Sequence, residues 1–237
     1  MGKHKVARWA ELETFNNVIQ PDILNRFGND HSVKGKWRTD IFRNENPIIL
    51  ELACGKGEYT IALSERFPDN NYIGIDIKGA RMWRGAKTAN DKELPNVAFL
   101  RTRIEFLSSF FAEDEVDEIW ITFPDPHQGR RNSNKRLTSP WFLNIYRNLL
   151  KNNGIIHLKT DNTELYNYTL TLAGYNNLEI IIATDNLYSE KPPAEILSVK
   201  THYENIFLEE GSRISYISFR LDKNKLIEDA ASQKNRK

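Results

Sequence analysis

The feature that most constrains the fold is an alternation of short apolar runs and helical stretches that begins at residue 48. Residues 48–52 are an apolar run typical of a strand, and the glycine-containing turn 53–57 follows them. Apolar side chains recur at helical spacing over residues 58–67, and a second apolar run spans residues 72–77. This β-turn-α-β unit predicts two parallel strands that are joined by a right-handed crossover.

The same alternation continues along the chain and predicts one doubly wound α/β domain over residues 46–221. We expect a mostly parallel seven-stranded sheet with helices on both faces. An N-terminal arm, residues 1–45, would precede this domain, and a charged C-terminal tail, residues 222–237, would follow it. The other predicted strands are 97–100, 118–123, 155–160, 178–184 and 214–221, and the other predicted helices are 80–92, 104–111, 140–150, 164–173 and 203–208.

Composition is that of an ordinary soluble globular protein, with 40% hydrophobic and 27% charged residues. The net charge is only +1, so any binding to nucleic acid must come from local basic patches. No apolar run is long enough to span a membrane, and no apolar signal segment follows the N-terminus. One cysteine and five histidines show no metal-ligand spacing. We therefore expect a cytoplasmic protein with no membrane or metal partner.

The turn after the first strand has the pattern of a cofactor site. Glu51 lies in the strand before the turn, and Gly55 and Gly57 lie in the turn itself. The glycines would let the backbone approach a ligand closely. A dinucleotide fingerprint needs a third glycine where this chain has Thr60, and Glu51 would repel a pyrophosphate but attract a cation. Asp76 ends the second strand, where an acid binds ribose hydroxyls in this architecture. The pattern favours S-adenosylmethionine, which carries a sulfonium and an ammonium, over a dinucleotide.

A second candidate site follows the predicted strand 118–123. Prolines fix the backbone on both sides of Asp125, which is therefore presented at the C-terminal end of that strand. Ligands bind at this edge in open α/β sheets. A run of cations follows within a few residues and predicts a phosphate-binding loop with salt-sensitive affinity, the alternative being a solvated loop. Its members are Arg130, Arg131, Lys135 and Arg136.

Two other groups of cations are open to either of two interpretations. The predicted arm begins with a basic stretch, and it is either mobile with solvated charges or becomes ordered on nucleic acid. Another group follows the predicted strand 72–77 and is either a solvated helix face or a contact for a polyanion. The first group is Lys3, His4, Lys5 and Arg8, and the second is Lys78, Arg81 and Arg84.

Several motifs together resemble the bacterial tRNA (guanine-N7)-methyltransferases, and the resemblance covers roughly residues 34–220. The most specific of them is the strand-end Pro-Asp-Pro with its basic loop. The motifs are Lys34-Gly-Lys-Trp37, Glu51-Leu-Ala-Cys-Gly-Lys-Gly57, Tyr72-Ile-Gly-Ile-Asp76, Phe123-Pro-Asp-Pro126, the run Arg131 to Arg136 with Leu137-Thr138, Lys159-Thr-Asp-Asn162 and Thr201-x-Tyr203-Glu204.

The resemblance implies a class I, Rossmann-like methyltransferase fold and methylation of N7 of the variable-loop guanosine, position 46, in tRNA. It implies that Glu51 and Asp76 hold the cofactor. It also implies that Asp125 is catalytic and lies between cofactor and target base, in contact with both. The partner would be tRNA, and the protein would be a monomer or a homodimer. The substrate nucleotide would be bound by Asp161, Thr201, Tyr203 and Glu204.

The chain departs from the family pattern at three places. The family usually has Asp or Asn where this chain has Arg103, at a cofactor-binding position, so the backbone or Glu105 would hold the adenine. It usually has Trp and then Lys at the positions of His127 and Gly129, so that Arg130 would replace the missing cation. Finally, the histidine of the family's basic loop is replaced here by an asparagine at residue 132.

Guanine N7 carries a lone pair and no proton, so its methylation needs placement and charge stabilisation but no general base. Asp125 and Asp161 end successive predicted strands and could converge on one base. Three other functions stay open. The chain could methylate another RNA position or a small molecule, or it could be a tRNA-binding protein that has lost catalysis. A nicotinamide dehydrogenase is disfavoured by Glu51 and by the missing third glycine.

Overall fold

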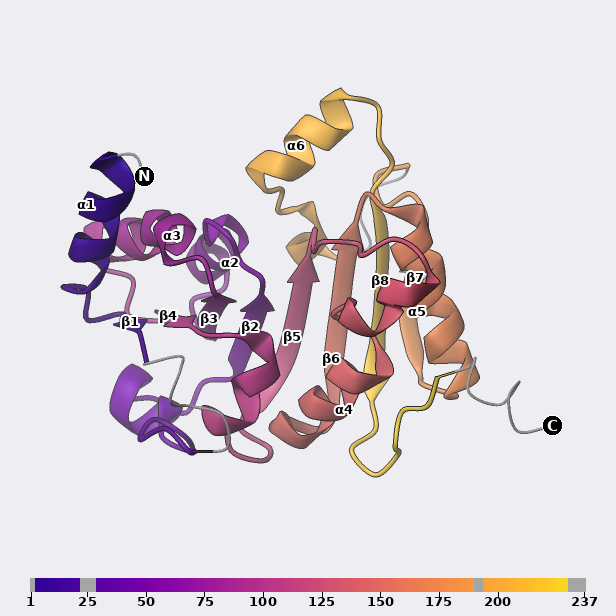
Figure 1. The fold of residues 1–237 in the computed structure, drawn as a ribbon, viewed down its shortest axis with the longest axis horizontal. Coiled ribbons are helices and arrows are strands. Elements are labelled where there is room, and N and C mark those ends of the chain that lie inside the picture. Colours follow the sequence, from indigo (N-terminus) through magenta and orange to yellow (C-terminus); the bar gives the residue numbers. More distant parts are fainter. Residues whose placement is uncertain (1–2, 22–28, 190–193, 230–237) are drawn as a thin grey trace. The chain divides into compact units, whose positions relative to one another are not determined.

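A computed structural model describes residues 3–21, 29–189 and 194–229 of the 237-residue chain (Figure 1). The chain divides into two compact units, residues 1–116 and 117–237. Each unit contains four of the eight strands that the described residues form.

The first unit contains a parallel sheet in the order β1-β4-β3-β2. Every residue of β2 and β3 is buried, which explains why both read as continuous apolar runs. Glu51 lies beside Gly74 in the register, and Asp76 lies beside Arg101. The strands are β1 (Val18–Ile19), β2 (Ile48–Leu52), β3 (Asn71–Asp76) and β4 (Val97–Arg101), and the helices are α1 (Lys3–Leu12), the π-helical η2 (Trp37–Phe42), α2 (Glu58–Arg66), α3 (Gly79–Asp91) and the 3₁₀ helix η3 (Ile104–Ser109).

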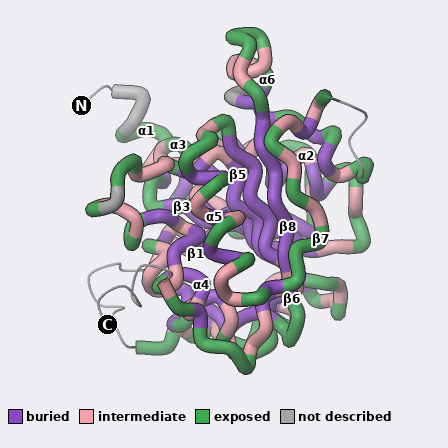
Figure 2. Tube along the Cα trace, turned by 90° about the vertical axis from the view of Figure 1, so that its right-hand side faces the viewer, coloured by how far each residue is buried: buried purple, intermediate pink, exposed green. Residues whose placement is uncertain are grey.

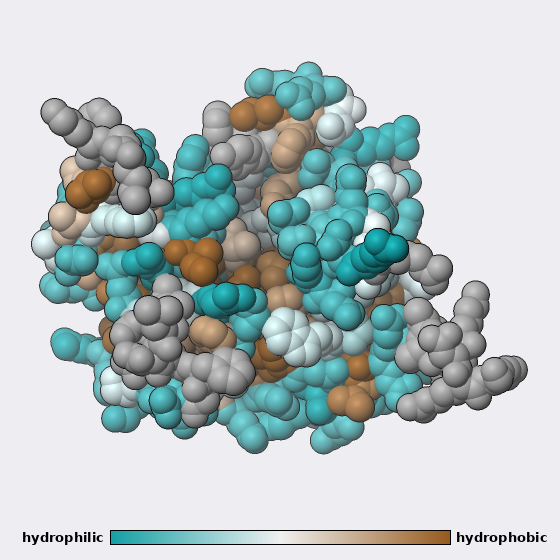
Figure 3. All heavy atoms as spheres, viewed as in Figure 1, coloured by the Kyte–Doolittle hydropathy of each residue, from teal (hydrophilic) through white to brown (hydrophobic). Residues whose placement is uncertain are grey.

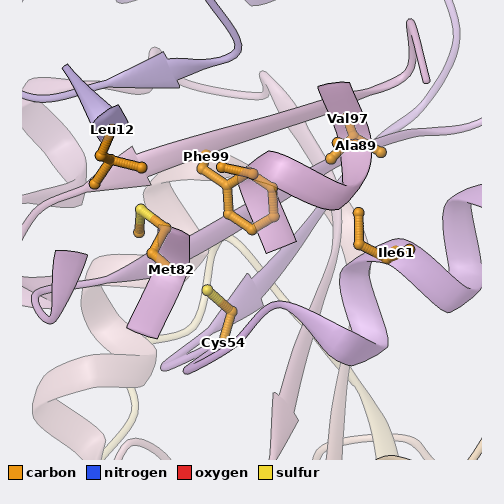
Figure 4. Packing of buried hydrophobic residues seen from close by; sticks show 8 residues of the cluster. Leu12, Cys54, Ile61, Met82, Ala89, Val97 and Phe99 are labelled. Atoms are coloured by element: carbon orange, nitrogen blue, oxygen red, sulfur yellow. The ribbon is translucent and has the colours of Figure 1, made fainter. Parts of the chain in front are cut away.

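The ring of Phe99 lies in the core of this unit, among the side chains labelled in Figure 4. Three glycines make room for it. A Cβ added at Gly57 would lie 2.6 Å from a Phe99 ring carbon, and one at Gly74 would lie 2.7 Å from it. A Cβ at Gly85 would lie 2.8 Å from the ring and 2.6 Å from the carbonyl oxygen of Lys56. The glycine turn after β2 is therefore packed against β4 and α3 with no room for side chains between them.

The second unit contains strands in the order β5-β6-β8-β7, and β8 runs antiparallel to both β6 and β7. Most strands are buried, whereas β7 is partly exposed along its length (Figure 2). The strands are β5 (Val116–Thr122), β6 (Leu150–Thr160), β7 (Ile180–Thr184) and β8 (Ser215–Leu221), and the helices are the 3₁₀ helix η4 (Arg130–Lys135), α4 (Pro140–Leu149), α5 (Thr163–Tyr175), the 3₁₀ helix η5 (Glu195–Ser198) and α6 (His202–Glu209).

Two contacts show that β5 and β6 run in the same direction. The rings of Trp120 and His157 stack with centroids 3.9 Å apart, and further along both strands the Phe123 amide donates to the Lys159 carbonyl at 2.9 Å. The mostly parallel α/β class predicted from the sequence is therefore confirmed. The described residues contain eight strands instead of seven, because the two-residue strand β1 is too short to produce a periodic pattern.

The described residues before β2 are folded against the first unit, where the sequence pattern had indicated little regular structure. Leu12 and Trp37 are both buried. The Trp37 indole N–H donates to the Phe110 carbonyl at 2.8 Å, and the Glu115 carboxylate accepts from the Gly35 amide at 3.0 Å. Isolated aromatic residues of this kind pack without helical or strand periodicity, so no pattern revealed them. The boundaries 1–45, 46–221 and 222–237 stay predictions.

Part of the predicted tail is also anchored. Ile227 is buried, and its backbone exchanges two hydrogen bonds with the Asn144 side chain, at 2.9 and 3.0 Å. Residues 230–237 lie outside the described part of the chain. Hydrophilic residues cover most of the face seen in Figure 3. Within the described ranges, no helix has the length and apolar character needed to cross a bilayer.

The contacts of Phe99 and Gly85 lead to a prediction for stability. We expect Gly85→Ala to lower the free energy of unfolding by about 1–3 kcal/mol, because its methyl group would overlap the Lys56 carbonyl and the Phe99 ring. Gly174→Ala, in the open on α5, is the matched control and should raise stability by up to roughly 1 kcal/mol. Urea unfolding of both variants checks this. Equal effects at the two sites would contradict the packing argument.

Candidate functional site

The two glycines of the turn between β2 and α2 have different surroundings. Both have positive φ, 57° at Gly55 and 69° at Gly57, which only glycine adopts without strain. Gly57 is packed against Phe99, as described above. A Cβ at Gly55, in contrast, would meet nothing nearer than the Ala53 carbonyl oxygen at 4.0 Å. Gly55 is therefore the position at which the turn leaves room for a ligand to approach the backbone.

Glu51 is buried, and its carboxylate accepts hydrogen bonds from the first turn of α2. Its Oε2 accepts a hydrogen bond from the Thr60 amide at 2.8 Å and another from the Thr60 hydroxyl. Thr60 is in the first turn of α2, where backbone N–H groups lack partners within the helix. The carboxylate thus brings negative charge to the place where a dinucleotide would put its pyrophosphate. The preference of this turn for a cationic cofactor over a dinucleotide stays a prediction.

Asp76 connects the end of β3 to the glycine turn. Its Oδ2 accepts from the Gly55 amide at 2.9 Å, and its Oδ1 accepts from the Lys78 amide at 2.7 Å. Each carboxylate oxygen has a further lone pair with which it can accept from a hydroxyl group. Burial raises the pKa of the Cys54 thiol, and the negative charges of Glu51 and Asp76 raise it further. The structure therefore brings both predicted carboxylates to one turn and keeps Cys54 protonated and inert.

Arg103 lies between β4 and η3, as the N-cap of η3, and its guanidinium is bound to a neighbour. Its Nη2 lies 2.8 Å from Oε1 of Glu105, and the guanidinium lies 5.7 Å from the centre of the Phe106 ring. Partial burial raises the pKa of Glu105, but the hydrogen bond and the charge of Arg103, together with a backbone hydrogen bond, outweigh it, so the pKa lies below its ordinary value. Glu105 is therefore an ionised acceptor at the edge where β2, β3 and β4 end.

In the second unit, the turn after β5 holds Asp125 in a strained backbone. Phe123 has φ 47° and His127 has φ 44°, values that residues with side chains rarely adopt. The Phe123 ring packs 5.7 Å from Phe207, and its amide is bound to Lys159 as described above. Asp125 itself is exposed and accepts from the His127 amide at 3.4 Å. Strain of this kind is found at functional sites, where surrounding contacts maintain it.

Asp161 is exposed and follows the end of β6. Because β5 and β6 are adjacent and run in the same direction, Asp125 and Asp161 follow strands that end at one edge. Two exposed carboxylates at one sheet edge match the sequence prediction. They can accept hydrogen bonds from a group that offers two N–H donors.

The basic loop contains two kinds of cation. Arg136 is only 4% exposed, and its Nη2 lies 2.5 Å from Oε1 of Glu164, while its Nε donates to the His127 carbonyl at 3.3 Å. Its guanidinium also lies 4.5 Å above the Tyr168 ring. Arg136 therefore uses its donors to hold the loop in place, and its predicted contact with phosphate stays a prediction.

Arg131 and Lys135 remain exposed, as expected for phosphate ligands. The side chain of Arg130 lies outside the part that the structure describes. Glu164 also accepts from the Gly129 amide at 3.2 Å. The hydrogen bonds from Gly129 and Arg136 lower the pKa of Glu164, so this carboxylate is charged near neutral pH and anchors both ends of η4.

The segment Thr201 to Glu204 forms the start of α6 instead of an open binding surface. The Thr201 hydroxyl accepts from the Glu204 amide at 3.2 Å, and Glu204 accepts from the Thr201 amide at 3.3 Å. This is a capping box, which the Thr-x-x-Glu spacing itself signals. Glu204 is fully buried, and its predicted contact with the substrate stays a prediction. The Tyr203 side chain is outside the described part.

Glu204 belongs to a buried network that the sequence did not reveal. Lys159 is also fully buried, and its Nζ lies 2.8 Å from Oε1 of Glu204 and donates to the Val199 carbonyl at 3.0 Å. The Tyr188 hydroxyl donates to Glu204 at 2.5 Å. Burial lowers the pKa of Lys159, and the charge of Glu204 opposes that shift. Burial and the same carboxylate raise the pKa of Tyr188, which stays protonated as a donor. The sign of this network in the sequence is Lys159, a lysine within the predicted apolar strand 155–160.

Comparison with known proteins finds similarity to a family model and to proteins named as tRNA methyltransferases. A family model described as "Putative methyltransferase" matches residues 45–216. A "tRNA (guanine-N(7)-)-methyltransferase" of Christiangramia forsetii is 50% identical over 220 residues, which cover 92% of this chain and 98% of the relative. Relatives with the same name are 51% identical in Porphyromonas gingivalis (89% and 86% covered) and 32% identical in Listeria welshimeri (94% and 99% covered).

Solved structures share the fold at low sequence identity. The 16S rRNA methyltransferase KamB superposes with a TM-score of 0.61 and 12% identity, over 84% of this chain and 97% of the other. A structure described as an antibiotic-related methyltransferase gives a TM-score of 0.58 and 17% identity, over 78% and 92%. At this identity the likeness establishes the class I methyltransferase fold alone.

The buried network generates a testable prediction. Glu204→Leu would leave Lys159 buried without its partner, so we expect the free energy of unfolding to fall by about 3–5 kcal/mol. The double variant Glu204→Leu/Lys159→Met should lose clearly less, with a coupling energy on the order of 1–3 kcal/mol in a double-mutant cycle.

The partly exposed pair Lys151 and Asp117 serves as the control for this cycle, because solvent screens it. Its coupling energy in the same urea-unfolding experiment should not exceed about 1 kcal/mol. Additive losses at Lys159 and Glu204 would show that the two charges do not depend on each other.

Proposed function

The chain belongs to the family of tRNA (guanine-N7)-methyltransferases, and from this premise we propose that it methylates N7 of the variable-loop guanosine, position 46, of tRNA with S-adenosylmethionine. The observation that carries the proposal is the 50% identity to the Christiangramia forsetii relative over 98% of that protein's length. The carboxylates of Glu51, Asp76, Asp125 and Asp161 support it, because they lie near the C-terminal ends of strands, the edge where ligands bind in this kind of sheet.

The residues at the first unit's sheet edge suit a cofactor that combines positive charge with a ribose. Glu51 provides negative charge beside the turn, Asp76 has lone pairs for ribose hydroxyls, and Gly55 leaves space beside the backbone. In this proposal the adenine is held by Glu105 or by backbone groups near Arg103. When bound, S-adenosylmethionine supplies an electrophilic methyl group on its sulfonium.

The exposed carboxylates of the second unit suit the guanine. N1–H and N2–H of guanine can donate to Asp125 and Asp161, and these donors strengthen as the ring becomes cationic on methylation. Asp125 would also face the cofactor. Placing the base in line with the methyl group is worth on the order of 7–11 kcal/mol in favourable cases. Neither carboxylate needs to remove a proton, because N7 carries none. Thr201 and Glu204 contribute by positioning α6.

The exposed cations of the basic loop would bind the tRNA backbone. N7 lies in the deep, narrow major groove of A-form RNA, which side chains cannot enter, so the target guanosine has to be exposed from the tRNA core. Arg131 and Lys135, together with Arg130, would hold the phosphates around it. Arg136 fixes the loop that carries them.

A nucleoside digest tests the reaction itself. After incubation with labelled S-adenosylmethionine and unmodified tRNA, we expect the label in 7-methylguanosine alone. Label in a different nucleoside would assign the chain to another RNA position. Calorimetry that detected no cofactor binding, with or without tRNA, would identify a tRNA-binding protein without catalysis.

Asp125→Asn tests the role of the strand-end carboxylate. The amide keeps the shape but lacks the charge that stabilises the cationic purine, so we expect kcat to fall by about 10²–10³ while KM for tRNA changes little. Glu209→Gln, an exposed carboxylate on α6, is the control and should leave both constants unchanged. Normal turnover at saturating tRNA, with only KM raised, would reduce Asp125 to a binding residue.

A further inference from the structure

We propose that α1 and the N-terminal half of α3 form a second phosphate-binding surface for tRNA, in addition to the basic loop. We call it the α1–α3 surface and define it by Arg8, Lys78, Arg81 and Arg84. The identity of the nucleic acid rests on the proposed function, whereas the surface itself rests on the contacts and charges described below.

The first observation is an excess of exposed positive charge. All four cations of the α1–α3 surface are exposed. The two carboxylates on the same helices are already engaged, since Glu11 lies 3.5 Å and Asp91 lies 3.3 Å from Nζ of Lys87. Among the described residues, no carboxylate forms an ion pair with Lys78, Arg81 or Arg84. The α1–α3 surface therefore carries positive charge that can bind a polyanion.

The second observation is that α1 is held firmly against α3, beside which it lies in Figure 1. Leu12 is buried against Met82 in the core cluster (Figure 4). The Trp83 indole N–H donates to Glu11 at 2.8 Å, and the Arg8 guanidinium lies 4.8 Å above the Trp83 ring. Trp83 thus holds a cation of α1 against α3, the helix that also carries Arg81 and Arg84.

The third observation is that helix stability does not account for these cations. Lys78 is the N-cap of α3, Arg81 is in its first turn, and that turn has no acidic residue. Positive side chains at a helix N-terminus face the positive end of the helix dipole and are unfavourable there. A role in binding explains why they are present. The exposed apolar side chains Val6 and Ile77, on the same two segments, add contact area for sugars and bases.

The test is the salt dependence of tRNA binding by Arg81→Gln/Arg84→Gln. Each lost phosphate contact should reduce the slope of log K against log[salt] by about 0.7–0.9, so we expect a reduction of about 1–2 and weaker binding of an unmodified tRNA transcript between 50 and 200 mM KCl. Lys92→Gln, at the other end of α3 and paired with Glu65, is the matched control and should change neither value.

Two further measurements make the result decisive. Calorimetry with S-adenosylmethionine should give wild-type affinity for the double variant, and its urea-unfolding midpoint should be equal to or above that of the wild type. An unchanged salt slope would overturn the proposal, as would weaker cofactor binding without a change in slope. The nucleoside digest decides the proposed function separately, because the slope is measured by binding whatever nucleoside is methylated.

Discussion

The ion pair between Lys159 and Glu204 is the interaction on which the second unit of the structure depends. Removing two charges from water is costly, and only close pairing with further hydrogen bonds offsets that cost. Tyr188 and the Val199 carbonyl supply those bonds. One buried pair therefore joins the end of β6, the segment before α6 and α6 itself. Phe123, bound to the Lys159 carbonyl, extends the same support to the turn that presents Asp125.

In the first unit, buried carboxylates accept hydrogen bonds from the backbone. Glu51 satisfies the start of α2, and Asp76 holds the Gly55 amide. Both acids therefore shape the turn while they keep negative charge beside it. The Phe99 ring fills the space beside Gly57, where a side chain has no room, but it does not approach Gly55. A rigid turn that presents charge at one open position is preorganised for a cationic ligand.

Charge in the sequence does not by itself identify a binding residue. Arg131 and Arg136 lie five positions apart in the same basic run, yet Arg131 is exposed and Arg136 is buried against Glu164 and Tyr168. Lys159 and Lys78 differ in the same way, one buried in an ion pair and the other exposed at a helix start. In each case the partner decides whether a cation supports the protein or is available to a polyanion.

The sequence by itself determined the α/β class, the order of the major strands and helices, and the placement of Glu51, Asp76, Asp125 and Asp161 at strand ends, because periodicity and turn chemistry act over a few residues. Tertiary structure decided the antiparallel direction of β8, the packing of Trp37, and the structural roles of Arg136 and Glu204. These depend on partners far away in the chain, such as Lys159, which lies 45 residues before Glu204. Local patterns carry no information about such pairs, since only folding brings the two side chains together and removes water from between them.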